Sequence, residues 1–105
     1  MKIQRHKFKA IRTEKDGKNF DSKIEARYYS QLKMRQSAGE VIFFLCQVPF
    51  LLPGGVRYVS DFQVFLSDGT VEFIDVKGRD TPMSIAKRKM VEDLYPVQIK
   101  IVTKV

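Results

Sequence analysis

The sequence contains one cysteine, Cys46, and one histidine, His6. A single cysteine excludes an intrachain disulfide and is typical of a reducing cytoplasm, so we expect a cytoplasmic location. Zinc sites, histidine–metal nucleases and cysteine–histidine proteases need more such side chains than the chain has. These three classes are therefore disfavoured, and His6 is expected at the surface.

Long hydrophobic runs are also missing. The longest, Val41–Leu52, contains Gln47 and Pro49 and is too short to span a bilayer. The basic N-terminus has no apolar segment behind it, so we expect no signal peptide. With 105 residues, of which 44% are apolar, the chain is expected to fold as one globular domain over residues 1–105.

Positive charge is concentrated in the first third of the chain. Residues 1–36 carry 11 Lys and Arg against 4 Asp and Glu, whereas residues 37–105 carry 8 of each. A basic surface of this kind suits a polyanion such as nucleic acid, although a cationic face that only confers solubility is the alternative. Residues 1–19 are expected to form a basic arm or a short hairpin.

A helix is predicted over residues 21–38, with Asp21 or Ser22 as its N-cap. Apolar residues recur at i, i+4 and i+8 from Ile24 and form a core-facing stripe. Glu25 borders this stripe. It is expected either to have a basic or metal partner or to interact only with the helix dipole.

The apolar run over residues 40–52 is typical of a strand buried on both faces. Pro49 is expected to end its regular pairing or to mark a bulge. Gln47 is a polar residue within the run. As a buried amide it needs partners, so it either forms a structural hydrogen bond or lines a polar site.

Residues 58–78 predict a β-hairpin that carries acidic residues. The turn Ser67–Gly69 separates its two apolar runs. Alternation of side chains puts Asp75 and Lys77 on one face of the second strand. If Asp61 meets that face, two carboxylates and an ammonium converge. Carboxylates are ligands for a hard divalent cation, and an ammonium beside them can stabilise the charge on a phosphate. The alternative is an Asp61–Lys77 salt bridge with Asp75 in solvent.

A second helix is predicted over residues 82–94, with Thr81 as its N-cap. Lys87 borders its apolar stripe and can hold a phosphate, whereas Arg88 and Lys89 fit a solvated face at least as well. The helix is expected to bury four apolar side chains: Met83, Ala86, Met90 and Leu94.

A last, half-exposed strand is predicted over residues 97–102. The order of elements is then helix, strand, two-stranded hairpin, helix and strand. This order predicts an α/β fold, in which a mixed sheet has a helix on each side.

The acids resemble the pattern of the PD-(D/E)xK, or restriction-endonuclease-like, nucleases. That pattern has an acid on the first helix, here Glu25, an acid on a strand, here Asp61, and Asp-x-Lys on the next strand, here Asp75–Lys77. The chain is similar to a family of small phage-encoded proteins within that superfamily. The matching segments are FDSKIEARYYSQL (20–32), QVP (47–49), YVSDF (58–62), DVKG (75–78), and Thr81 followed by Lys87 and Lys89.

Two residues depart from the pattern. Ser60 stands where the motif has proline, which changes little because this residue is not a ligand. Ile74 stands where relatives often carry an additional acid, and the nearby Glu72 is expected to point to the opposite face. The number of metal ions is therefore left open.

The resemblance implies a restriction-endonuclease-like fold and metal-dependent hydrolysis of DNA. Asp61 and Asp75 would ligate Mg²⁺ or Mn²⁺, and Glu25 would complete the metal shell or orient Lys77. Lys77 would position water or stabilise charge on the phosphate, and Gln47 would line the site.

The phage members resemble Holliday junction-resolving enzymes, which implies branched DNA, a homodimer and a role in recombination or packaging in the host cytoplasm. A nicking nuclease without junction preference and a non-catalytic DNA-binding protein are the alternatives. The expected DNA-binding residues are Lys7, Lys9, Arg12, Lys23, Arg27, Arg79, Lys87 and Lys89.

Overall fold

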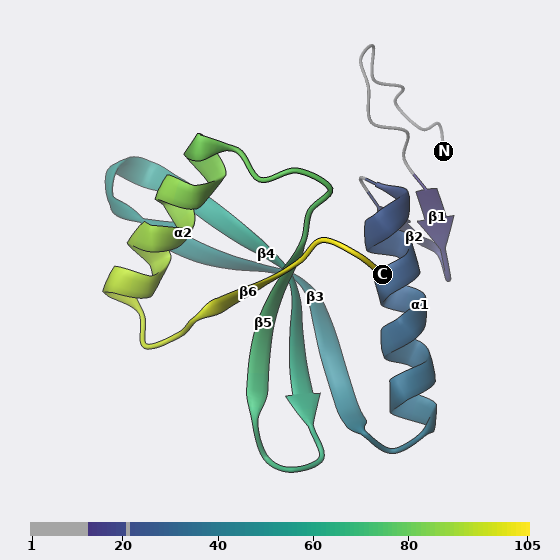
Figure 1. Ribbon diagram of the computed structural model, residues 1–105. Helices are drawn as coiled ribbons and strands as arrows, with labels where there is room; N and C mark the ends of the chain where they lie inside the picture. Colours follow the sequence, from purple (N-terminus) through teal and green to yellow (C-terminus); the bar gives the residue numbers. More distant parts are fainter. Residues whose placement is uncertain (1–12, 21) are drawn as a thin grey trace.

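A long antiparallel hairpin of β3 (Val41–Leu52) and β4 (Val56–Leu66) supplies the two longest strands of the fold (Figure 1). The structure is a computed structural model that describes residues 13–20 and 22–105. The two strands are joined at Pro53–Gly55, where both glycines have positive φ angles, 79° and 75°. Glycine adopts this conformation without steric cost, which allows the short connection between the two strands.

The sheet has four strands in the order β3-β4-β5-β6. β5 (Val71–Val76) follows β4 through the predicted turn, in which Asp68 Oδ1 accepts hydrogen bonds from the backbone N–H and the hydroxyl of Thr70. β6 (Ile99–Val102) is parallel to β5, and α2 (Pro82–Leu94) forms the crossover that a parallel pair requires. The fold is therefore a small α/β domain with a mixed sheet, as predicted.

α1 (Lys23–Ser37) precedes the sheet. Its N-cap is Ser22, whose hydroxyl accepts a hydrogen bond at 3.2 Å from the backbone N–H three residues later. A short hairpin of β1 (Thr13–Lys15) and β2 (Lys18–Phe20) lies before the helix. It falls in the segment for which the sequence predicts an arm or a short hairpin.

The core consists of two clusters, one beneath each helix. Between α1 and the sheet, Leu32, Phe62 and Ile74 are fully buried. Beneath α2, Val91 packs in a cluster with Ile99. The two clusters use alternate positions of β5 and β6, because neighbouring strand residues point to opposite faces. Figure 1 accordingly shows the two helices on opposite sides of the sheet.

β3 bends at Gln47, whose φ is 56°. Before the bend, Phe44 and Cys46 pack against the cluster beneath α1. After it, Phe50 and Leu52 belong to the cluster beneath α2. The long hairpin therefore contributes to both parts of the core.

The prediction that β3 is buried on both faces is wrong. Phe43, Leu45 and Leu51 are exposed, because β3 is an edge strand among the described residues and α1 covers one of its faces. The prediction for Pro49 is also wrong, since pairing continues through it and it lies opposite Val59. Proline is tolerated on an edge strand, which needs hydrogen bonds on one side only.

The predicted buried face of α2 is wrong by one residue position, a rotation of about 100°. Val91 is fully buried and Ser84 and Arg88 are half-buried. The helix is held in this rotation at its C-terminal end by Tyr95, whose ring centroid lies 5.2 Å from that of Phe50. The four side chains expected in the core are instead exposed: Met83 (68%), Ala86, Met90 and Leu94.

None of the helices in the described part of the chain has the length and apolar character needed to cross a membrane.

Candidate functional site

β4 and β5 diverge at the end of their ladder, and two aspartates take over the hydrogen bonding there. The last paired residues are Phe62 and Ile74. Beyond them, the backbone N–H of Asp61 donates to Asp75 Oδ1 at 2.9 Å, and the backbone N–H of Val76 donates to Asp61 Oδ2 at 2.9 Å. Each carboxylate thus accepts a hydrogen bond from a strand N–H group that would otherwise need a backbone carbonyl as its partner. The two predicted acids therefore lie together on adjacent strands.

Asp75 is deeply buried, with an exposed fraction of 2%. Burial raises the pKa of its carboxyl, while the N–H of Asp61 and the charges of Lys77 and Arg88 oppose this shift. The alternative in which Asp75 faces solvent is therefore wrong. Alternation along β5 puts Asp75 on the same face as Phe73, which packs against the cluster beneath α2.

Gln47 and Glu25 extend the site across β3 to α1. Gln47 occupies the strand position across from Asp61, between two β3 residues that pair with β4 on either side of it. The Gln47 Nε2 donates to Glu25 Oε2 at 3.1 Å. Glu25 is 5% exposed and borders the buried face of α1, as predicted. Gln47 itself is exposed, so its predicted burial is wrong: it lies at the bend of an edge strand.

Lys77 follows Asp75 by two residues and is half-buried. Its backbone N–H donates to the carbonyl of Val102 at 2.9 Å, which fixes its main chain to the segment of β6. The pKa of the nearby Asp80 is lowered first by hydrogen bonds from Arg88 and further by the charge of Lys77. The positive charge of Lys77 therefore favours the ionised forms of both Asp75 and Asp80, which lie on either side of it in the chain.

The pair Asp80–Arg88 is the part of the site that sequence reasoning missed. Arg88 Nη2 lies 2.6 Å from Asp80 Oδ2, and Nη1 lies 2.8 Å from Oδ1. The Arg88 side chain is only 12% exposed, so its predicted place on a solvated face is wrong. The rotation of α2 is the reason. An acid directly before the N-cap Thr81, with an arginine two turns into the helix, is the signal that could have indicated the pair.

The departures from the nuclease motif also have defined positions. Ser60 is fully buried, and its hydroxyl lies 3.3 Å from one carbonyl oxygen of β4 and 3.3 Å from one of β5. It therefore helps to join these strands beside the aspartates. Glu72 lies 3.7 Å from Lys100 and on the opposite face of β5 from Asp75, as expected.

The predicted DNA-binding cations are spread over several elements. Lys23 and Arg27 of α1, together with Lys15, line a hollow of about 250 Å³. Arg79, which precedes α2, and Lys89, in the middle of this helix, are exposed, whereas Lys87 of the same helix is half-buried. Several of the residues considered in the sequence lie outside the described ones: His6, Lys7, Lys9, Arg12 and Asp21.

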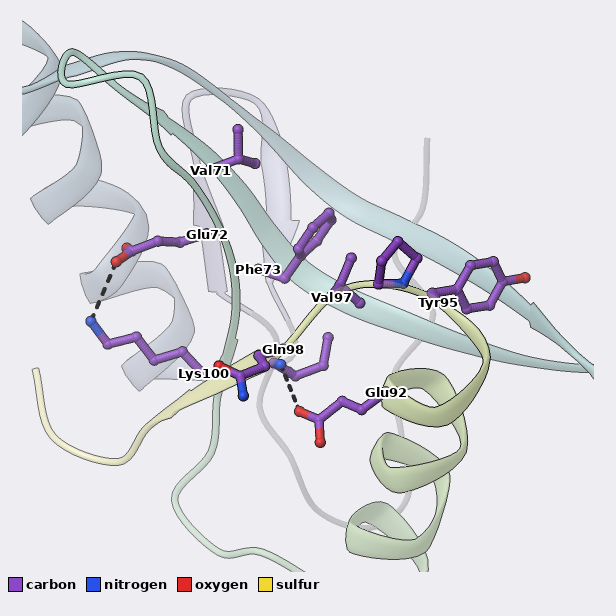
Figure 2. Close-up of a pocket in the computed structure, with 10 residues that line it drawn as sticks. Val71, Glu72, Phe73, Glu92, Tyr95, Val97, Gln98 and Lys100 are labelled. Atoms are coloured by element: carbon purple, nitrogen blue, oxygen red, sulfur yellow. Dashed lines mark hydrogen bonds and ion pairs between the residues drawn. The ribbon is translucent and has the colours of Figure 1, made fainter.

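A larger hollow of about 880 Å³ lies at the C-terminal end of α2 (Figure 2). Its walls include Val71, Phe73 and Val97. The carboxylate of Glu92 accepts a hydrogen bond at 2.8 Å from the backbone N–H of Ile99. Among the described residues, none of the predicted site residues lines this hollow, so it is separate from the aspartate pair.

The aspartate pair fits a hard divalent cation. Mg²⁺ is commonly bound by one or two protein carboxylates and otherwise by water. A positive ion would also offset the burial that disfavours the ionised form of Asp75. Within residues 13–20 and 22–105, no group of three or more His, Cys, Asp or Glu side chains is placed to hold a metal ion. Asp61 and Asp75 are therefore the candidate ligands, and Glu25 as a third ligand stays a prediction.

The fold and the site together define a small α/β domain with two aspartates and a lysine where the central strands of its sheet diverge. The chain belongs to the family described as "Protein of unknown function (DUF1064)", which matches residues 5–105. No curated protein and no solved structure matches the chain. The family description names no activity, so the residues of the site are the basis for a functional proposal.

Proposed function

We propose that this protein is a divalent-metal-dependent endonuclease that hydrolyses phosphodiester bonds of DNA, with Mg²⁺ or Mn²⁺ as its cofactor. The proposal is carried by the contact between Asp61 and Asp75 where β4 and β5 diverge, with Lys77 two residues further on. Phosphodiester hydrolysis of this kind needs carboxylates that hold a cation and a positive group near the phosphate. The two aspartates come from adjacent strands of one sheet, and Lys77 directly follows the second of these strands.

Each residue of the site has a distinct role in this proposal. Asp61 and Asp75 bind the cation, whose Lewis acidity makes water a better nucleophile and offsets charge on the phosphate. Lys77 orients the attacking water or stabilises the negative charge that develops on the phosphate. Gln47 lines the site, and its hydrogen bond with Glu25 orients its side chain.

We propose further that the fold is restriction-endonuclease-like. The order of elements is α1, β3, β4, β5, α2 and β6, which agrees with the order that the resemblance implies. Glu25 on α1, Asp61 on β4 and Asp75 on β5 occupy the elements on which that pattern carries its acids. This agreement supports the assignment.

Branched DNA such as a Holliday junction is the substrate that we propose, with a role in phage recombination or packaging in the host cytoplasm. Symmetrical cutting of a junction needs two active sites, so a homodimer is expected. Sedimentation equilibrium of the purified protein tests this expectation. A mass of two chains supports it, and a monomer that still makes paired cuts would contradict it.

Two other functions share part of this chemistry. A nicking nuclease without junction preference would use the same site on a different DNA. A non-catalytic DNA-binding protein would keep the fold alone, but the chain retains the four charged residues Glu25, Asp61, Asp75 and Lys77. Retention of the whole set favours a catalytic protein.

Replacement of the aspartates tests the proposed site. Asp61→Asn and Asp75→Asn each keep an oxygen that can accept the backbone hydrogen bond but remove the negative charge. We expect each to lower the cleavage rate on the order of 10³-fold, because several kcal/mol of transition-state stabilisation is removed. DNA binding, measured by fluorescence anisotropy, should stay close to that of the unmodified protein.

A matched control is Asp93→Asn, which removes the same charge from an exposed position of α2. It should leave the cleavage rate unchanged. Cleavage that survives both Asp61→Asn and Asp75→Asn would refute the site assignment.

For Lys77→Ala we expect a lower rate with nearly unchanged metal affinity, and the reverse result would make this lysine a structural residue.

A further inference from the structure

The segment between β5 and α2 is attached to the fold at both of its ends and through Asp80. It runs from Lys77 to Thr81 and has no regular secondary structure. At its start the backbone N–H of Lys77 donates to the carbonyl of Val102, and at its end the Thr81 hydroxyl accepts from the backbone N–H of Ser84. Between these ends, the side chain of Asp80 forms the contact with Arg88 described above.

The contact between Asp80 and Arg88 is well placed to hold this segment. Two parallel hydrogen bonds of 2.6 and 2.8 Å fix both the distance and the relative orientation of the carboxylate and the guanidinium. Arg88 Nη1 also lies 3.3 Å from Ser84 Oγ, so the arginine is anchored on its own helix. With 12% of the arginine side chain and 28% of the aspartate side chain exposed, this pair is partly shielded from water.

The pair also lies within electrostatic range of the proposed catalytic residues. Asp80 follows Lys77 by three residues, and the pKa of its carboxyl is lowered first by the hydrogen bonds from Arg88 and further by the charge of Lys77. Without Arg88, the Asp80 carboxylate would be left as a strong competing partner for the Lys77 ammonium.

We propose that Asp80 and Arg88 are positioning residues of the site, and that their two-pronged bridge fixes the Lys77–Thr81 segment and keeps the Lys77 ammonium available to the Asp61–Asp75 pair. This inference rests on the proposed nuclease function. Arg88 acts through Asp80 in this arrangement, because both of its terminal nitrogens are already engaged and its side chain is largely covered.

A double-mutant cycle on cleavage tests the positioning role. Asp80→Asn, Arg88→Lys and the double variant are compared with the unmodified protein at saturating and at limiting DNA. Each single variant should lower kcat by about 10- to 100-fold with KM nearly unchanged, since displacement of a catalytic group has effects of this size. The double variant should be no worse than either single one, because both remove the same bridge. Arg88→Lys keeps the positive charge but removes the planar guanidinium that forms two parallel hydrogen bonds. A lower kcat in this variant would therefore show that the geometry of the bridge matters, and not only its charge.

The pair Arg35–Glu40 supplies the matched control. It joins the last turn of α1 to the residue before β3 with Nη2 and Oε2 2.7 Å apart, whereas Glu25 lies in the first turn of that helix. Arg35→Lys and Glu40→Gln should leave kcat unchanged. A kcat within twofold of the unmodified value in Asp80→Asn and Arg88→Lys would overturn the proposal. A raised KM in Arg88→Lys alone would also overturn it and would make Arg88 a direct contact of the DNA phosphates.

A second readout does not depend on cleavage. Backbone amide exchange measured by NMR should be faster at Lys77–Thr81 in Asp80→Asn and in Arg88→Lys, and unchanged there in Arg35→Lys. Unaltered exchange at Lys77–Thr81 would overturn the positioning role whether or not the protein cuts DNA. Faster exchange in a protein that cuts no DNA would instead refute the nuclease function and retain the role of the bridge in holding this segment.

Discussion

At the scale of single residues, Asp75 is held in an environment that disfavours its charge. A buried carboxylate is tolerated when it is hydrogen-bonded and near positive charge, and Asp75 has the N–H of Asp61 together with Lys77 and Arg88. The raised pKa nevertheless means that burial outweighs these contacts. Groups of this kind gather at functional sites, where binding of a ligand supplies the missing interaction.

Asp75→Asn should therefore stabilise the fold at neutral pH in EDTA. The folded pKa of Asp75 lies above its unfolded value of about 3.8, so the ionised carboxylate lowers the free energy of unfolding at neutral pH. This penalty disappears as the pH falls below the unfolded value, where both states are protonated. The gain from Asp75→Asn, measured by urea denaturation, should thus be largest near pH 7 and shrink towards pH 4.

Addition of Mg²⁺ or Mn²⁺ extends the same experiment. The metal should raise the free energy of unfolding of the unmodified protein by mass action and have little effect on Asp75→Asn. Asp93→Asn, on the exposed face of α2, should change stability by less than about 0.5 kcal/mol under all conditions. An Asp75→Asn variant less stable than the unmodified protein at pH 7 in EDTA would contradict this account of the buried carboxylate.

The aspartates and the lysine could be predicted because they depend on local rules. Alternation along β5 puts Asp75 and Lys77 on one face, and the turn at Ser67–Gly69 determines which residues of β4 lie beside them. Asp80 and Arg88 could not be paired in this way. Their contact depends on the rotation of α2, and that rotation is determined by packing between elements far apart in the sequence.

At the scale of elements, α2 and β3 differ most from the sequence-based expectation. Apolar periodicity indicates which face of a helix prefers burial, but α2 packs instead through Val91 and the half-buried Arg88. An apolar run likewise indicates burial without saying whether a second layer covers it, and β3 lies at an edge of the sheet among the described residues. The ends of the helices were better predicted, because capping by Ser22 and Thr81 is a local interaction.

Substitutions in α2 test its observed rotation. Val91→Ala should lower the free energy of unfolding by about 2 kcal/mol, because it removes fully buried methyl groups from the cluster beneath the helix. Met90→Ala should change it by less than about 0.5 kcal/mol, because this side chain is exposed. Urea denaturation of both variants provides the comparison. A larger decrease for Met90→Ala than for Val91→Ala would support the rotation predicted from the sequence.

At the scale of the whole molecule, charge and site are arranged in a way that suits a polyanionic substrate. The net charge of +7 comes from residues 1–36, and Lys15, Lys23 and Arg27 of this part line one hollow beside α1. The same helix carries Glu25 and, through Gln47, reaches the strand position across from Asp61. DNA held by α1 would therefore lie on an element that also belongs to the site.

Removal of residues 1–12 tests the contribution of the N-terminal charge. This segment carries five Lys and Arg residues and no acid. The truncated protein should bind duplex DNA more weakly, and the dependence of log K on log salt should become less steep by about 0.9 for each phosphate that the protein no longer neutralises. Fluorescence anisotropy at several salt concentrations measures both quantities. An unchanged slope would mean that these residues do not bind the phosphates.

The central claim is that Asp61, Asp75 and Lys77 form the active site of a metal-dependent DNA endonuclease. The most direct measurement incubates the purified protein with labelled four-way junction, linear duplex and single-stranded DNA, each with Mg²⁺, with Mn²⁺ or with EDTA. The account predicts paired nicks on the junction in the presence of metal and no cleavage in EDTA. Tight binding of the junction without cleavage under either metal would contradict it and would make the protein a DNA-binding module that retains only the fold.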